Sequence, residues 1–188
     1  LIKIFGIKVN IKGRKFKKNV LFVSNHISYL DIFVLGSSVD GVFVAKSEIE
    51  SWPIINKLCK LGRTIFVNRN DIIRVKGQMN RITNILKRGY SVILFPEGTS
   101  SNGSKVLPFK SSLLGVIEDK GPQEFYIQPL SISYSKLDGI PLEIKFRPFF
   151  AWFGNMDLIS HVWKFLGLGF SEVNVNFHEP KKFSHFKD

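Results

Sequence analysis

Short runs of apolar, often β-branched residues recur along this chain and alternate with segments of helical periodicity. The runs NVLFVSN and GVFVAKS are apolar almost throughout, which is typical of strands that are covered on both faces. Strands that alternate with helices predict an α/β sandwich, in which a mixed, largely parallel sheet carries helices on its faces. We expect a single domain over residues 1–188, because no linker or internal repeat interrupts the pattern.

The expected elements follow from this periodicity and from the positions of Pro and Gly. Strands are expected within 7–12, 19–25, 41–47, 64–69, 91–98, 125–134, 142–146 and 171–177. Helices are expected within 28–39, 52–62, 71–88 and 155–169.

The charge balance constrains the partners of the chain. It has 27 basic and 15 acidic residues, a net charge of +12, and such a surplus favours a polyanion as partner: nucleic acid, an anionic membrane surface or a phosphorylated substrate. No stretch has the roughly 18–20 uncharged apolar residues of a spanning helix. The chain begins at Leu1, so we expect a preceding N-terminal segment; the single Cys59 excludes an internal disulfide and favours a reducing compartment.

The stretch NHISYLD places His26 and Asp31 at the end of a predicted buried strand. Within one helix they would lie about 140° apart, so they can meet only if His26 precedes the helix and Asp31 reaches back from its first turn. An imidazole oriented by a carboxylate can take a proton from a hydroxyl. Ser28 and Asp31 also match a capping box, so Asp31 as a helix cap, with His26 as a turn residue, remains an alternative. No G-x-S-x-G elbow is present, so the hydroxyl would belong to the substrate.

Two further polar stretches follow predicted strands. FPEGTSSNG, after the run SVIL, offers backbone N–H groups, small hydroxyls and one carboxylate in a loop, which suits a phosphate or a polyol. In GRTIFVNRND, Arg69 ends an otherwise apolar strand and is a candidate for binding an anion. An ordinary polar turn and a structural ion pair are the respective alternatives.

The order and spacing of these stretches resemble the glycerolipid acyltransferases of the 1-acylglycerol-3-phosphate acyltransferase type. His26 and Asp31 look like the His-x4-Asp motif of that family, and GRTIFVNR looks like its second block. FPEGTSS is similar to its Phe-Pro-Glu-Gly-Thr-Arg-Ser block, and IQPLSI to its fourth, with Pro129 in the matching place. The four blocks run from Asn25 to about Ile132 in the expected order.

The resemblance implies transfer of a fatty acyl group from acyl-CoA or acyl carrier protein to the hydroxyl of a lysophospholipid, most simply 1-acylglycerol-3-phosphate. It implies His26 as general base and Asp31 as the group that orients its imidazole, with no acyl-enzyme, no metal and no cofactor besides the thioester co-substrate. The residues that it implies for binding the acceptor and its phosphate are Arg69, Glu97, Gly98, Thr99, Lys46 and Lys110.

The chain also departs from the family pattern. Ser100 replaces the arginine that usually follows Glu-Gly-Thr, unless Lys105 or Lys110 substitutes for it, and Ser112 stands where many members have glycine. These departures leave the acceptor open, with lyso-ornithine lipid and glycerol-3-phosphate as alternatives. A basic nucleic-acid-binding domain is the alternative from another class, but no helix-turn-helix, zinc finger or RNP-like strand is visible, and we expect no nucleic acid partner.

A lysophospholipid acceptor implies work at a membrane surface. We expect the protein at the cytoplasmic face of the inner membrane, peripheral or anchored by an N-terminal segment outside this chain. The densest basic cluster consists of Lys8, Lys12, Arg14, Lys15, Lys17 and Lys18, and each could contribute about 1 kcal/mol near an anionic leaflet. Phe16 and the run of Phe149, Phe150, Trp152 and Phe153 are candidates for insertion, with core packing as the alternative for that run.

Overall fold

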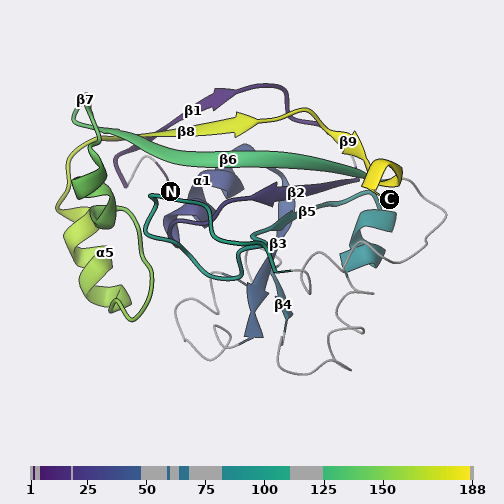
Figure 1. The fold of residues 1–188 in the computed structure, drawn as a ribbon, viewed down its shortest axis with the longest axis horizontal. Coiled ribbons are helices and arrows are strands. Elements are labelled where there is room, and N and C mark those ends of the chain that lie inside the picture. The colour runs from purple at the N-terminus through teal and green to yellow at the C-terminus, as the bar shows by residue number, and fades with distance from the viewer. Residues whose placement is uncertain are drawn as a thin grey trace.

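The computed structural model describes residues 2, 5–17, 19–47, 59, 64–67, 82–110 and 125–186. Within them, seven strands form the continuous order β1-β8-β6-β2-β5-β3-β4 of one sheet, and two short strands pair with β6 (Figure 1). The strands are β1 Ile7–Lys12, β2 Val20–Ser24, β3 Gly41–Lys46, β4 Ile65–Val67, β5 Ser91–Leu94, β6 Tyr126–Leu137, β7 Ile140–Pro141, β8 Ser171–Phe177 and β9 Lys181–Lys182. The helices are α1 Leu30–Ser38, α5 Leu158–Leu166 and the 3₁₀ helices η3 Ile144–Phe149 and η4 Phe183–Phe186.

The centre of the sheet is parallel. β2 lies between β5 and β6 and is parallel to both, β5 is parallel to β3, and β3 is parallel to β4. β8 runs antiparallel to β6 and parallel to the edge strand β1. The prediction of a mixed, largely parallel sheet in an α/β fold is therefore confirmed.

The central strands bury both of their faces, as their continuous apolar runs predict. Successive side chains of a strand point to opposite faces, and in β2 Val20 and Phe22 belong to one apolar cluster whereas Leu21 belongs to the other. The first cluster includes Val34 and Leu35 of α1, and the second includes residues of the helical segment 82–87. Helices thus cover both faces of the sheet.

The segment 142–146, which the sequence predicts as a strand, contains no strand: η3 begins within it at Ile144. β7 is only two residues long, and after Pro141 the amide of Leu142 still donates to the carbonyl of Ser135 before the chain turns away. Ile144 and Phe146 of η3 are exposed rather than paired in the sheet. The strand prediction is wrong here: the pairing of β7 with β6 ends at Pro141, and Ile144–Phe149 form a 3₁₀ helix instead.

The aromatic residues predicted as candidates for membrane insertion differ in how far they are exposed. The ring of Phe16 packs against that of Tyr126, with centroids 4.3 Å apart. Phe150 is buried at 1% exposure, so core packing is the correct reading for it, whereas Phe149 is 46% exposed. Trp152 and Phe153 are partly buried.

Some sequence predictions lie outside the described residues. The predicted helix at 52–62 does so except for Cys59, and the predicted helix at 71–88 is described only from residue 82, where 82–87 are helical. Arg69, Ser112 and Lys18 lie outside them as well.

A fully buried glutamine ties the basic segment between β1 and β2 to the sheet. Gln128 of β6 donates through Nε2 to the carbonyls of Arg14 and His178, both at 2.8 Å, and accepts from the amide of Phe16 at 3.0 Å. Buried polar groups that lose such partners destabilise the folded state.

Replacing Gln128 with Leu should therefore lower the free energy of unfolding by about 1–3 kcal/mol, because the amide and two carbonyls lose their partner. Chemical denaturation of the purified variant measures this. Ser133→Ala, at an exposed position of the same strand, is the matched control and should stay near the wild-type value. Equal stability of both variants would contradict the anchoring role.

Candidate active site

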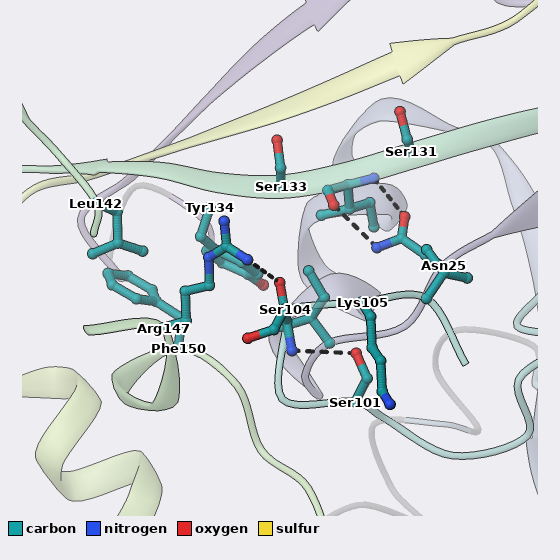
Figure 2. Close-up of a pocket in the computed structure, with 14 residues that line it drawn as sticks. Asn25, Ser101, Ser104, Lys105, Ser131, Ser133, Tyr134, Leu142, Arg147 and Phe150 are labelled. Carbon is teal, nitrogen blue, oxygen red and sulfur yellow. Dashed lines mark hydrogen bonds between the residues drawn. The ribbon is translucent and has the colours of Figure 1, made fainter. Parts of the chain in front are cut away.

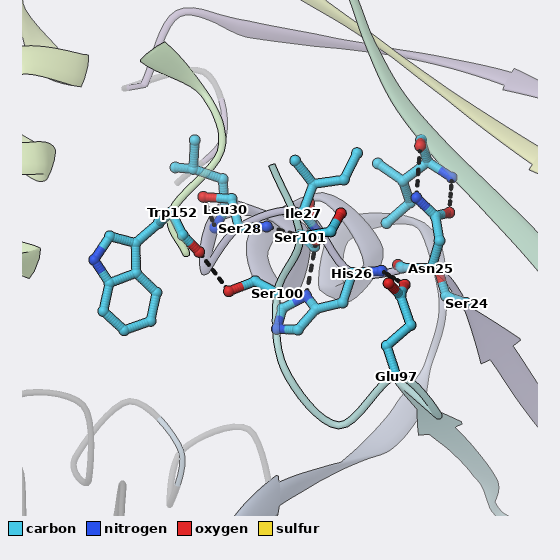
Figure 3. A network of polar contacts seen from close by, with 12 residues as sticks. Ser24, Asn25, His26, Ile27, Ser28, Leu30, Glu97, Ser100, Ser101 and Trp152 are labelled. Atoms are coloured by element: carbon cyan, nitrogen blue, oxygen red, sulfur yellow. Dashed lines mark hydrogen bonds and ion pairs between the residues drawn. The ribbon is translucent and has the colours of Figure 1, made fainter. Parts of the chain in front are cut away.

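The candidate site lies where β2 ends and the chain enters α1. The side chain of Asn25 accepts from the amide of Ile132 at 2.8 Å and donates to its carbonyl at 3.1 Å, which joins the end of β2 to β6 (Figure 3). His26 follows directly. In open α/β sheets, the carboxyl ends of the parallel strands are where functional groups usually gather.

His26 and Asp31 meet as the sequence suggested. His26 Nδ1 lies 2.9 Å from Asp31 Oδ2, and the side chain of Asp31 is fully buried whereas that of His26 is 19% exposed. The helix starts at Leu30, so His26 precedes it and Asp31 reaches back. When Nδ1 carries the proton and donates it to the carboxylate, Nε2 is left as a proton acceptor.

Asp31 also caps the turn before the helix. Its Oδ2 accepts from the amides of Ile27 at 2.7 Å and Ser28 at 3.0 Å. The Ser28 hydroxyl accepts from Leu30 at 3.4 Å, and the Asp31 amide donates to the Ser28 carbonyl, so only the carboxylate half of the predicted capping box forms. The two interpretations of Asp31 are therefore compatible, since one carboxylate fills both places.

Tyr134 completes the surroundings of Asp31, and sequence reasoning missed it. Tyr134 lies in β6, and its hydroxyl donates to Asp31 Oδ1 at a distance of 2.9 Å. Burial above all, then the charge of Asp31 and the hydrogen bond to it, raises the pKa of Tyr134 well above its usual value, so the phenol keeps the proton that it donates. The sequence predicted a strand over 125–134, but nothing local pointed from Tyr134 to a residue 103 positions earlier.

Glu97 lies in the loop after β5 and is 1% exposed. Its Oε1 accepts from the amide of His26 and its Oε2 from the amide of Leu107, both at 2.7 Å. Both carboxylate oxygens thus accept from backbone amides, which gives Glu97 a positioning role; its contact with the acceptor stays a prediction. Phe95 adds a stacked ring 4.1 Å from that of His26.

The other residues predicted to bind the acceptor lie in different parts of the fold. Gly98 and Thr99 follow Glu97 in the same turn, where Gly98 has a φ of +74° that favours glycine. Lys110 is exposed, and its amide donates to the carbonyl of Pro96. Lys46 is the last residue of β3, and its side chain lies outside the described part of the chain. All of Arg69 lies outside that part as well.

Ser100, which stands where the resemblance expects an arginine, has a structural contact. Its hydroxyl donates to the carbonyl of Trp152, and the amide of Trp152 donates to the carbonyl of Ile27 at 3.1 Å (Figure 3). The amide of Ser101 donates to the carbonyl of His26 at 2.9 Å. These bonds join the loop after β5 directly to His26 and, through Trp152, to the neighbouring Ile27.

A pocket of about 230 Å³ lies beside this segment (Figure 2). Four parts of the chain line it: Asn25 and Ile27, most residues of the loop 101–106, residues 131–134 of β6, and the three residues Leu142, Arg147 and Phe150. Among the described residues, no group of three or more His, Cys, Asp or Glu side chains could hold a metal ion. Nor does a helix in those residues have the length and apolar character to span a bilayer.

The family model described as "Acyltransferase" matches residues 7–133, a range that contains the pair His26–Asp31 and the loop of Glu97. The chain belongs to the acyltransferase family. The resemblance seen in the four sequence blocks is therefore confirmed.

Two groups of relatives, named for different acceptor lipids, are similar to this acyltransferase. The lyso-ornithine lipid O-acyltransferase of Rhizobium meliloti is 40% identical over 181 residues, covering 94% of this chain and 62% of that protein. That of Brucella abortus is 37% identical, covering 95% and 68%. The 1-acyl-sn-glycerol-3-phosphate acyltransferase of Neisseria meningitidis is 35% identical over 116 residues, covering 62% and 46%.

A solved structure has the same fold. The crystal structure of the 1-acyl-sn-glycerophosphate acyltransferase of Thermotoga maritima matches with a TM-score of 0.62 and 24% identity, over 100% of this chain and 70% of that one. The match thus covers 62% and 68% of the two lyso-ornithine lipid relatives, 46% of the Neisseria relative and 70% of the Thermotoga chain.

Replacing Tyr134 with Phe should destabilise the fold by about 1–3 kcal/mol, because hydrogen bonds to a buried charged group are among the stronger ones. Chemical denaturation measures the effect. Tyr126→Phe, at a partly buried position of the same strand, serves as control and should change stability less. Equal losses in the two variants would show that the bond to Asp31 contributes nothing specific.

Proposed function

We propose that this domain transfers a fatty acyl group from an acyl-CoA or acyl carrier protein thioester to the hydroxyl of a lyso-lipid, either a lysophospholipid or a lyso-aminolipid. The observation that carries the proposal is the 2.9 Å contact between His26 Nδ1 and the buried Asp31 carboxylate, in a chain of the acyltransferase family. This contact leaves the second imidazole nitrogen available as a base. The histidine is also partly exposed, so a substrate hydroxyl can reach it.

In the proposed reaction, Nε2 of His26 removes the proton of the acceptor hydroxyl as its oxygen attacks the thioester carbonyl. The C–O bond forms, the C–S bond breaks, and the leaving thiolate takes the proton back from the imidazolium. Asp31 holds the tautomer and stabilises the imidazolium cation. Tyr134 and the two amides on Asp31 keep that carboxylate oriented.

No acyl-enzyme is needed for this route. The free cysteine of the described part, Cys59, is buried, and its burial raises the pKa of the thiol, which opposes the thiolate that a nucleophile requires. We therefore propose direct transfer, with the thioester as co-substrate.

The first acceptor to test is lyso-ornithine lipid. The two relatives with that name reported above align over 94% and 95% of this chain, whereas the Neisseria relative named for 1-acylglycerol-3-phosphate aligns over 62%. This order reverses the one suggested by the sequence blocks, and 1-acylglycerol-3-phosphate is the second acceptor to test. The predicted contributors to acceptor binding stay Arg69, Glu97, Gly98, Thr99, Lys46 and Lys110.

His26→Ala should lower kcat by about 10²–10⁴-fold, the usual contribution of a positioned general base, and Asp31→Asn should lower it with little change in acceptor KM. Acyl transfer to both lyso-lipids from both donors measures this, with circular dichroism to check the fold. His178→Ala, at an exposed histidine, is the control. Near-normal turnover of folded His26→Ala would overturn the assignment, and a loss of stability alone in Asp31→Asn would reduce Asp31 to a cap.

We also propose that the protein works at an anionic membrane surface, at the cytoplasmic face of the inner membrane. Lys8, Lys12, Arg14, Lys15 and Lys17 are all exposed, although Lys8 lies 3.9 Å from Glu172 and Lys15 donates to the carbonyl of Ser38. The cluster can add long-range attraction to an anionic leaflet.

The outer face of α5 is a second candidate for membrane contact. Ile159, Trp163 and Leu166 are 75%, 78% and 48% exposed, and their spacing places them on one stripe of the helix. The opposite face is buried through His161 and Phe165. A helix that is apolar on its exposed face as well needs an apolar partner, and tryptophan favours the membrane interface.

Vesicle co-sedimentation across a salt series tests both surfaces. Each of Lys12→Gln and Lys17→Gln should weaken low-salt binding to anionic vesicles about fivefold, since a lysine near the leaflet contributes about 1 kcal/mol. Trp163→Ser should remove binding that persists at high salt, where charges are screened.

The controls are Lys87→Gln and Tyr90→Ser, which are exposed elsewhere and should leave binding unchanged. Equal binding of the unaltered protein to neutral vesicles would remove the electrostatic part of the proposal. Unchanged high-salt binding of Trp163→Ser would remove α5 from it.

A further inference from the structure

The pocket beside the His26 segment has an apolar interior and cationic residues in its lining. Apolar side chains and one phenol ring contribute most of the wall: Ile27, Ile132, Tyr134, Leu142 and Phe150. Arg147 and Lys105 are the charged residues that line it, and none of the fourteen lining residues is Asp or Glu. This combination suits a ligand that joins hydrocarbon to an anionic group.

A backbone carbonyl holds Arg147 in place. It is partly buried, and its Nη1 donates to the carbonyl of Gly103 at 2.8 Å, as Figure 2 shows. Within the described part of the chain no carboxylate lies within ion-pair distance of it. Lys145, two positions earlier in η3, is in contrast exposed and paired with Glu143 at 3.0 Å. A guanidinium has five N–H donors and favours two-point binding of carboxylate or phosphate.

The pocket adjoins the proposed catalytic pair through its wall. Asn25 and Ile27, the neighbours of His26 in the chain, both line it. Tyr134 lines it as well and donates its hydroxyl to Asp31. A molecule in the pocket therefore contacts the segment and the side chain that hold His26 and Asp31.

We propose that Arg147 binds the anionic group of the lipid acceptor, a carboxylate or a phosphate, and that the apolar wall takes the adjoining hydrocarbon. Lys105 adds positive charge at the same pocket. This inference rests on the proposed acyl transfer and names a binding residue for it. Arg147 lies far from the loop 101–106 in the sequence but contacts it in the structure. Ser100, directly before that loop, instead donates its hydroxyl to the carbonyl of Trp152.

The test is steady-state kinetics of Arg147→Gln, with Lys145→Gln from the same 3₁₀ helix as matched control. The acceptors are a carboxylate-bearing lyso-ornithine lipid, the phosphate-bearing 1-acylglycerol-3-phosphate and a neutral monoacylglycerol; the donors are acyl-CoA and acyl carrier protein. We expect the KM of the anionic acceptor that the protein uses to rise about tenfold or more in Arg147→Gln, because a charge-assisted contact is lost. The KM of the thioester, the turnover of monoacylglycerol and the behaviour of Lys145→Gln should stay near wild type.

Several results would overturn the inference. They are an unchanged KM for the anionic acceptors, an equal rise for monoacylglycerol, and a rise confined to the KM of acyl-CoA, which would assign Arg147 to the phosphates of that donor. Should Arg147→Gln fail to fold, Arg147→Lys, which keeps a donor for Gly103, and Lys105→Gln decide by the same acceptor-specific rise or its absence. A wild-type protein that acylates no lyso-lipid would instead refute the proposed function itself.

Discussion

The buried carboxylate of Asp31 requires hydrogen-bond donors, and the arrangement of the site follows from where they come from. A carboxylate without solvent is costly to keep charged unless several donors surround it. Asp31 has the amides of Ile27 and Ser28, the phenol of Tyr134 and the imidazole of His26. Three of these donors lie within five residues of Asp31, and the fourth, Tyr134, comes from β6, the strand next to β2. The carboxylate therefore orients the histidine only when the sheet is assembled.

A second buried carboxylate does the same for the loop that follows β5. Glu97 joins the amide of His26 to that of Leu107, so the loop after β5 and the turn after β2 are fixed to each other. Ser100 and Ser101 add contacts to Trp152 and His26. Rigid support of this kind keeps a catalytic side chain in position, and it gives the family's Pro-Glu-Gly-Thr block a structural reason beyond substrate binding.

The segment that follows β7 connects the proposed site to the proposed membrane surface. η3 contributes Arg147 to the pocket, while its Ile144, Phe146 and Phe149 are exposed. The helix α5 lies at the same end of the molecule as β7 (Figure 1). A lipid acceptor held with its hydrocarbon at this end would have its anionic group beside Arg147.

The sequence alone determined the α/β class, most strands and the helices α1 and α5, because runs of buried apolar residues and helical spacing are local patterns. It also singled out His26 and Asp31, since a turn and a helix start lie within six residues. Contacts between distant strands and loops could not be read in this way. Tyr134 beside Asp31, Glu97 on the His26 amide, Arg147 at Gly103 and the 3₁₀ helix in place of a strand at 142–146 were decided by the tertiary structure. Their physical reason is that a buried polar group takes whichever partner the assembled sheet brings to it, and that partner can lie far away in the sequence.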